Sequence, residues 1–149
     1  MPSLTTKDVC DHVVKPATET QQCAYIDLLH GQQTSAGAPL LAAANIFVSH
    51  AWKYDFKLVL SILENITQTE AKPIYFWFDL VINNQHGTVD RPFEWWCTTF
   101  KSSIESIGRV VLILAPWRDP IPLTRAWCLW ELFSAATPNV ATLIVKLLL

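Results

Sequence analysis

Four short apolar runs alternate with three segments of helical pattern between residue 44 and the end of the chain. Each run is about as long as one strand and is rich in β-branched or aromatic residues: NIFVSH, KPIYFWFDLV, RVVLILA and ATLIVKLLL. The segments between them begin near Tyr54, Phe93 and Leu123 and place apolar residues three and four positions apart, as in a helix. Such alternation predicts an α/β fold, in which right-handed crossovers join parallel strands and helices cover both faces of the sheet.

Local signals predict several boundaries of these elements. Asp55 is a suitable N-cap for the first helix, and Gly108 is a suitable stop for the second. The second strand is expected to end at Asp79. The polar segment NNQHGTVDRP that follows is expected to be a loop.

Residues 1–43 are expected to form a partly helical N-terminal extension in front of an α/β domain over residues 44–149. Thr5 and Asp8 have the spacing of a capping box, for a helix that Pro16 is expected to end. The segment CAYIDLL fits a helix or a strand equally well, and GQQTSAGAP has the composition of a loop. Because the chain stops at Leu149 inside the fourth expected strand, we expect a domain truncated at its C-terminus, with an exposed apolar edge.

Composition argues against several classes of function. Charged residues make up 16% of the chain, the net charge is -2 and no basic run occurs, so neither nucleic acid nor an anionic membrane is an expected partner. No apolar stretch approaches the roughly 20 residues of a membrane span, and the N-terminus lacks the pattern of a signal peptide. The four cysteines and four histidines lack metal-ligand spacing. We therefore expect no metal site, and reduced thiols in a cytoplasmic setting.

The carboxyl ends of the expected strands indicate where a ligand would bind, because open parallel sheets bind ligands beyond these ends. Ser49 and His50 end the first strand and are either ligand contacts, which we favour, or polar residues that only end the strand. Trp52 and Lys53 follow as candidate contacts to a phosphate or a base. Asp79, at the end of the second strand, either binds a ribose or has a structural role as a cap.

Glu131 is the only carboxylate between Asp119 and the end of the chain, within the aromatic segment LTRAWCLWELF. Trp127 lies four residues earlier on the same helix face, so both side chains can face the crevice. Glu131 is therefore either a catalytic acid or an exposed helix residue, and Trp127 either lines a pocket or packs in the core. The segment SHAWKYD after the first strand contains no glycine, which argues against a P-loop enzyme or a dinucleotide-binding dehydrogenase.

Four pieces of the chain, in order and with suitable spacing, resemble a TIR domain: NIFVSHAWK, YFWFDL, FKSSIESIGRVVLILAPW and TRAWCLWEL. The resemblance extends from about residue 45 to about residue 145 and is closest to the TIR-like group whose first strand contains FVSHAW. It implies a flavodoxin-like sheet of order 2-1-3-4, with the family's fifth strand missing. It also implies that residues 80–92 form the loop that gates the site and mediates contacts between domains.

The resemblance further implies an activity, because many TIR domains cleave NAD between nicotinamide and ribose. The family's catalytic acid, the glutamate of the WCxxEL helix, corresponds to Glu131, and the tryptophan that lines the pocket corresponds to Trp127. His50 inherits no role, since common TIR sequences have other residues after the serine. We expect an NAD glycohydrolase that needs no cofactor besides its substrate and is activated by self-association in signalling or defence. The alternatives are a non-catalytic module that binds other TIR-like domains and, third, a nucleotide-binding regulatory domain.

Overall fold

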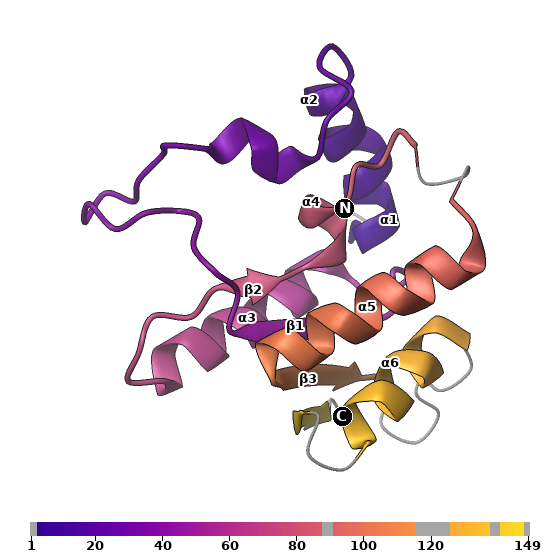
Figure 1. Cartoon of the computed structure of the whole chain (residues 1–149). Coiled ribbons are helices and arrows are strands. Elements are labelled where there is room, and N and C mark those ends of the chain that lie inside the picture. Colours follow the sequence, from indigo (N-terminus) through magenta and orange to yellow (C-terminus); the bar gives the residue numbers. More distant parts are fainter. Residues whose placement is uncertain (1–2, 88–90, 116–125, 138–140, 148–149) are drawn as a thin grey trace.

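The described residues form one parallel sheet with helices on both faces (Figure 1). This computed structural model describes residues 3–87, 91–115, 126–137 and 141–147, without the side chains of residues 126–129 and 132. The strands are β1 (Ile46–Ser49), β2 (Phe76–Trp77), β3 (Arg109–Leu114) and β4 (Thr142–Leu147), in the spatial order β2-β1-β3-β4 with parallel pairing throughout. The expected α/β class, flavodoxin-like sheet and strand order 2-1-3-4 are thus confirmed.

Helices cover the sheet from opposite sides. Helix α3 (Phe56–Thr69) packs on one face, whereas α5 (Phe93–Ile107) and α6 (Ala126–Ala136) lie on the other (Figure 1). Asp55 caps α3 as expected, because its carboxylate accepts hydrogen bonds from the backbone N–H groups of Lys57 (2.8 Å) and Leu58 (3.3 Å). The central strand β1 is buried along its whole length, which explains why its sequence is a continuous apolar run.

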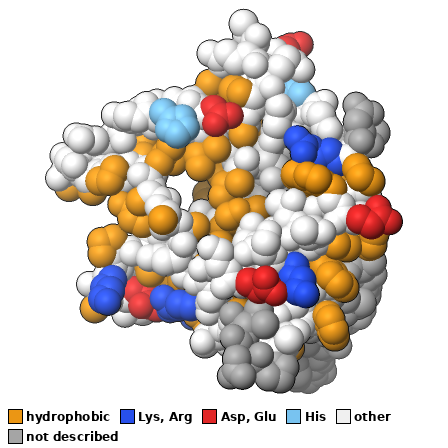
Figure 2. Space-filling view, viewed as in Figure 1, with side chains coloured by type: hydrophobic (Ala, Val, Ile, Leu, Met, Phe, Trp, Pro, Cys, Tyr) orange, Lys and Arg blue, Asp and Glu red, His pale blue; other side chains and the backbone are white. Residues whose placement is uncertain are grey.

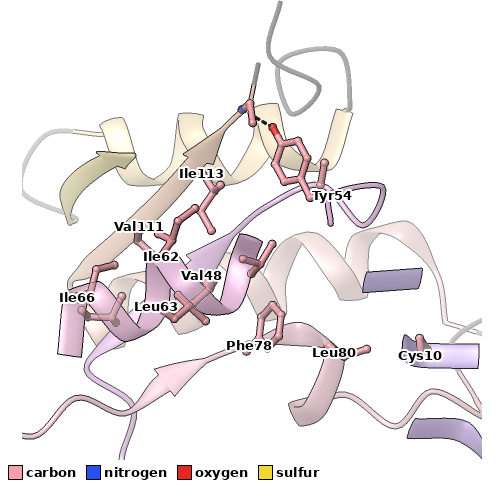
Figure 3. Packing of buried hydrophobic residues seen from close by; sticks show 14 of the residues in the cluster. Cys10, Val48, Tyr54, Ile62, Leu63, Ile66, Phe78, Leu80, Val111 and Ile113 are labelled. Atoms are coloured by element: carbon pink, nitrogen blue, oxygen red, sulfur yellow. Dashed lines mark hydrogen bonds between the residues drawn. The ribbon is translucent and has the colours of Figure 1, made fainter. Parts of the chain in front are cut away.

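The core has one part on each face of the sheet. Under α3, side chains of β1 and β3 pack with residues from α3, from the end of β2 and from the N-terminal segment (Figure 3). On the other face, Phe47 of β1 stacks on Trp77 of β2 at 4.5 Å between ring centroids, and Phe100 of α5 meets both rings edge-on. Both faces of the sheet are therefore covered by packed side chains.

Gly108 ends α5 with a left-handed backbone (φ 72°), and its N–H donates to the Ile104 carbonyl at 2.9 Å. A Cβ at this position would meet no atom within 4 Å, so Gly108→Ala tests the backbone conformation alone. We expect it to lower the free energy of unfolding by about 1 kcal/mol, measured by urea denaturation. Gly87→Ala is the matched control, because Gly87 has equal space and no positive φ. An equal loss in both variants would contradict the assignment of the effect to φ.

Pro16 does not end the first helix, contrary to expectation. After α1 (Thr6–Val9), with its Thr5–Asp8 capping box, the chain forms a wider π-helical segment η1 (Cys10–Val14) and continues as α2 (Lys15–Thr18). The Lys15 N–H donates to the Cys10 carbonyl, five residues back. In a regular α-helix a proline cannot donate the usual hydrogen bond to the carbonyl four residues earlier, and its ring crowds that carbonyl. The wider π-helical turn leaves room for the ring of Pro16. The ambiguous CAYIDLL segment is also helical, as the 3₁₀ segment η2 (Tyr25–Leu29).

The second strand is shorter than expected and does not reach Asp79. Only Phe76 and Trp77 pair with β1. The N–H groups of Val81 and Ile82 then donate to the Phe78 carbonyl, so Asp79 begins a short helix, α4 (Asp79–Ile82). The segment 80–92 therefore starts with a helical turn, and its residues 88–90 lie outside the described part.

The N-terminal segment packs against the carboxyl end of the sheet. Cys10 (1% exposed) and Val14 (3%) belong to the same core as β1, β3 and α3. Thr18 is fully buried, and its Oγ1 lies 2.8 Å from Nε2 of His86. Main-chain hydrogen bonds join residues 4–7 to the loop after β1: Thr6 N–H to Tyr54 O, Lys7 N–H to Trp52 O and Phe56 N–H to Leu4 O. The segment is therefore built into the domain.

Among the described residues, no helix is both long and apolar enough to cross a membrane.

Candidate active site

Glu131 of α6 lies against the carboxyl end of β1. The hydroxyl of Ser49, the last residue of that strand, donates a hydrogen bond to Oε2 of Glu131. Glu131 is 7% exposed and Ser49 is 1% exposed. The alternative of an exposed helix acid is therefore wrong. A carboxylate this deeply buried needs hydrogen-bond donors to remain charged, and Ser49 supplies one.

Tyr54 supports this end of the sheet, although the sequence did not indicate it. Its phenol oxygen accepts a 2.7 Å hydrogen bond from the N–H of Ala115, directly after β3 (Figure 3). The bond joins the loop after β1 to the end of β3. Tyr54 is 4% exposed, although Lys53 and Asp55 beside it suggest an exposed loop. The only available signal was that a phenol, once buried, requires a partner.

His50 faces the N-terminal segment. Its Nε2 lies 3.3 Å from Oγ1 of Thr6, and its ring centroid lies 4.9 Å from that of Phe78. His50 is 5% exposed and Thr6 is fully buried, so α1 covers the histidine that sequence reasoning placed at the ligand. The N-terminal segment, which was expected to be an extension in front of the α/β domain, thus packs against the residue that follows Ser49.

Trp52 and Asp79, both predicted ligand contacts, bind each other. The indole Nε1 of Trp52 donates to Oδ2 of Asp79 at 2.7 Å, and Gln85 Nε2 donates to the Asp79 carbonyl at 3.1 Å. The pair joins the loop after β1 to the start of α4. Asp79 is not the cap that was considered as the alternative, because no side chain caps α4 and the Asp79 carboxylate accepts from an indole. Its Oδ1 is buried and has no hydrogen-bond partner among the described residues. Lys53, the remaining candidate in this loop, is exposed.

The Trp52–Asp79 bond predicts different effects for two substitutions of the acid. Asp79→Ala should lower the free energy of unfolding by about 1–3 kcal/mol, because it leaves the indole N–H without an acceptor. Asp79→Asn should cost less, since its amide oxygen still accepts that hydrogen bond. Urea denaturation followed by Trp fluorescence measures both. Equal losses in the two variants would show that the bond is not what stabilises the loop.

The other predicted residues are only partly described. Trp127 belongs to α6, but its side chain lies outside the described part, as do those of Cys128 and Leu132 and all of residues 116–125. Ala135 of α6 is 2% exposed and belongs to the core around Phe47. Among the described residues, no group of three or more His, Cys, Asp or Glu is arranged to hold a metal ion.

A shallow hollow of about 320 Å³ lies elsewhere, toward the amino ends of β1 and β3. It is lined by Ala43, Ala44, Trp77, Ser102, Ser103, Ser106 and Ile107. Because Ser49 and Glu131 are at the carboxyl ends of the strands, this hollow is not part of their site.

Comparisons of the chain with protein-family models, with curated proteins and with solved structures found no match.

The sheet and the buried acid define the class of the protein. It is a flavodoxin-like α/β protein with a carboxylate at the carboxyl end of its central strand.

Proposed function

We propose that the chain is an NAD glycohydrolase of the TIR type, with Glu131 as its catalytic carboxylate and NAD as substrate. The observation that supports this proposal is the position of Glu131, buried at the carboxyl end of β1 and bonded to Ser49. Flavodoxin-like sheets bind nucleotides at this edge. The pattern that resembles the catalytic helix of TIR domains, TRAWCLWEL, is the one that brings this acid to the edge.

The chemistry requires only one carboxylate. Glycosidases use a pair, because one acid must protonate the leaving group while the other stabilises or attacks the oxocarbenium-like centre. Nicotinamide in NAD already carries a positive charge and leaves as a neutral base, so its departure needs no proton. What remains is to hold the ribose and to stabilise its developing positive charge until water adds to the anomeric carbon. A carboxylate performs this best where water is excluded.

Trp127 is proposed to line the pocket one helical turn before Glu131. The surroundings of the other predicted contacts differ. Ser49 touches the acid, whereas His50 faces Thr6 and Trp52 donates to Asp79. We therefore place the NAD ribose on the side of β1 that faces α6, away from the N-terminal segment.

A specific observation favours the second candidate function, a non-catalytic module that binds other TIR-like domains or itself. Phe93 of α5 is 59% exposed and Phe133 of α6 is 66% exposed, and the ring of Trp130 lies 5.8 Å from that of Phe133. Figure 2 shows apolar side chains at the surface on the side formed by the start of α5 and by α6. Exposed aromatic residues are typical of protein interfaces. Under the first proposal, the same surface would serve activation by self-association.

Release of nicotinamide from NAD tests the proposal directly. The whole chain is incubated with NAD at high protein concentration and also immobilised densely on a surface, and nicotinamide is measured by chromatography. The wild type should release it and Glu131→Gln should not. If neither releases nicotinamide, even when clustered, the enzyme proposal is wrong and the binding module becomes the better one. If both release it equally, the choice of Glu131 is wrong.

A further inference from the structure

The hydroxyl of Ser49 is a buried donor at a fixed point of the sheet. Strand β1 is central, and Ser49 is aligned with Leu112 of β3. Glu131, in contrast, has a long side chain whose carboxylate can occupy many positions unless something holds it. We propose that Ser49 is a positioning residue, which holds the Glu131 carboxylate toward the carboxyl end of the sheet. This inference rests on the proposed cleavage of NAD.

The burial of Ser49 bears on its role. Ser49 is 1% exposed and so has almost no surface to offer a ligand. Ser49 was predicted from the sequence as a ligand contact, and the geometry assigns it instead a role through Glu131.

The direction of the bond gives it a further effect. A serine hydroxyl donates and a carboxylate accepts, and such a bond to a charged acceptor is about twice as strong as one between neutral groups. The carboxylate is the group that would stabilise a cationic ribose, and the bond holds it in place. Removal of the hydroxyl should therefore slow the chemical step and leave substrate binding nearly unchanged.

The kinetic test compares three variants under the conditions in which wild type releases nicotinamide. Ser49→Ala should lower kcat about 10- to 100-fold, the range expected when a charged group loses a hydrogen-bond donor, with KM within about twofold of wild type. Ser49→Thr keeps the hydroxyl and should recover most of kcat. Ser134→Ala is the matched control, because Ser134 is also a small buried hydroxyl residue (3% exposed), and its Oγ has no partner among the described residues. It should leave kcat unchanged. An increase in KM at constant kcat in Ser49→Ala would overturn the proposal in favour of direct substrate contact.

A stability cycle tests the contact independently of NAD. Urea unfolding midpoints are measured for Ser49→Ala, Glu131→Met and the double variant, where methionine removes the acceptor with little change in volume. If the two groups are coupled, the loss of stability in the double variant should be smaller than the sum of the losses in the two single variants. Additive losses would overturn the positioning contact. Coupling without nicotinamide release from wild type would instead retain Ser49 as the residue that holds Glu131 and reject NAD as the substrate.

Discussion

Replacement of Glu131 by glutamine should lower the rate of nicotinamide release from NAD by at least about 100-fold, the loss typical of removing one preorganised electrostatic group from an active site. Glutamine has nearly the same shape, and its amide oxygen can still accept the Ser49 hydrogen bond, so the fold should be retained. What disappears is the negative charge. The loss should therefore appear mainly in kcat, because the charge acts on the positive centre that develops in the transition state.

The control for this variant is Glu105→Gln on α5. Glu105 is an exposed glutamate near the end of α5, and its carboxylate lies 3.9 Å from Nζ of Lys101. It belongs to neither of the two elements, β1 and α6, that form the candidate site. It should release nicotinamide at the wild-type rate and unfold at the wild-type urea concentration. If both glutamine variants lost activity equally, the effect would reflect the chain's overall charge, and Glu131 would have no special role.

The sequence predicted most of the architecture because the signals for it are local. The alternation of apolar strands and amphipathic helices specifies the parallel sheet, and Asp55 and Gly108 specify helix ends through their own side-chain and backbone chemistry. The position of Glu131 at the carboxyl end of β1 follows from the same logic, since the helix after the third strand begins near the carboxyl edge.

The surroundings of the site could not be predicted, because they depend on contacts between distant parts of the chain. His50 meets Thr6, 44 residues away, and Trp52 meets Asp79, 27 residues away. Neither pairing leaves a trace in the local pattern. A histidine or an aspartate at a strand end looks the same whether it faces a ligand or an adjacent segment. The proline in the first helix misled for a related reason, since the wider turn that accommodates it is itself part of the packed segment.

Val14→Asp should destabilise the whole domain, by at least about 3 kcal/mol in the free energy of unfolding, because it places an unpaired charge in a packed core. Val14 is 3% exposed and packs in the core that also holds Val48 and Val111 of the sheet. The matched control is Val13→Asp, one residue earlier in the same π-helical segment, where the side chain is 47% exposed. Its unfolding midpoint should stay close to that of wild type.

The thiol of Cys10 distinguishes a built-in segment from a separate extension. Cys10 is 1% exposed, and burial raises the pKa of its thiol, so both access and reactivity toward a thiol reagent are low in the folded chain. If the N-terminal segment is part of the domain, Cys10 in Val14→Asp should become reactive at the same urea concentration at which the sheet unfolds. If the N-terminal segment is independent of the domain, Cys10 in Val14→Asp should react without urea. The sheet, followed by Trp fluorescence, should then unfold at the same urea concentration as in wild type. Because the segment also covers His50, the second result would mean that His50 can become exposed without loss of the fold. The NAD ribose would then no longer be confined to the side of β1 that faces α6.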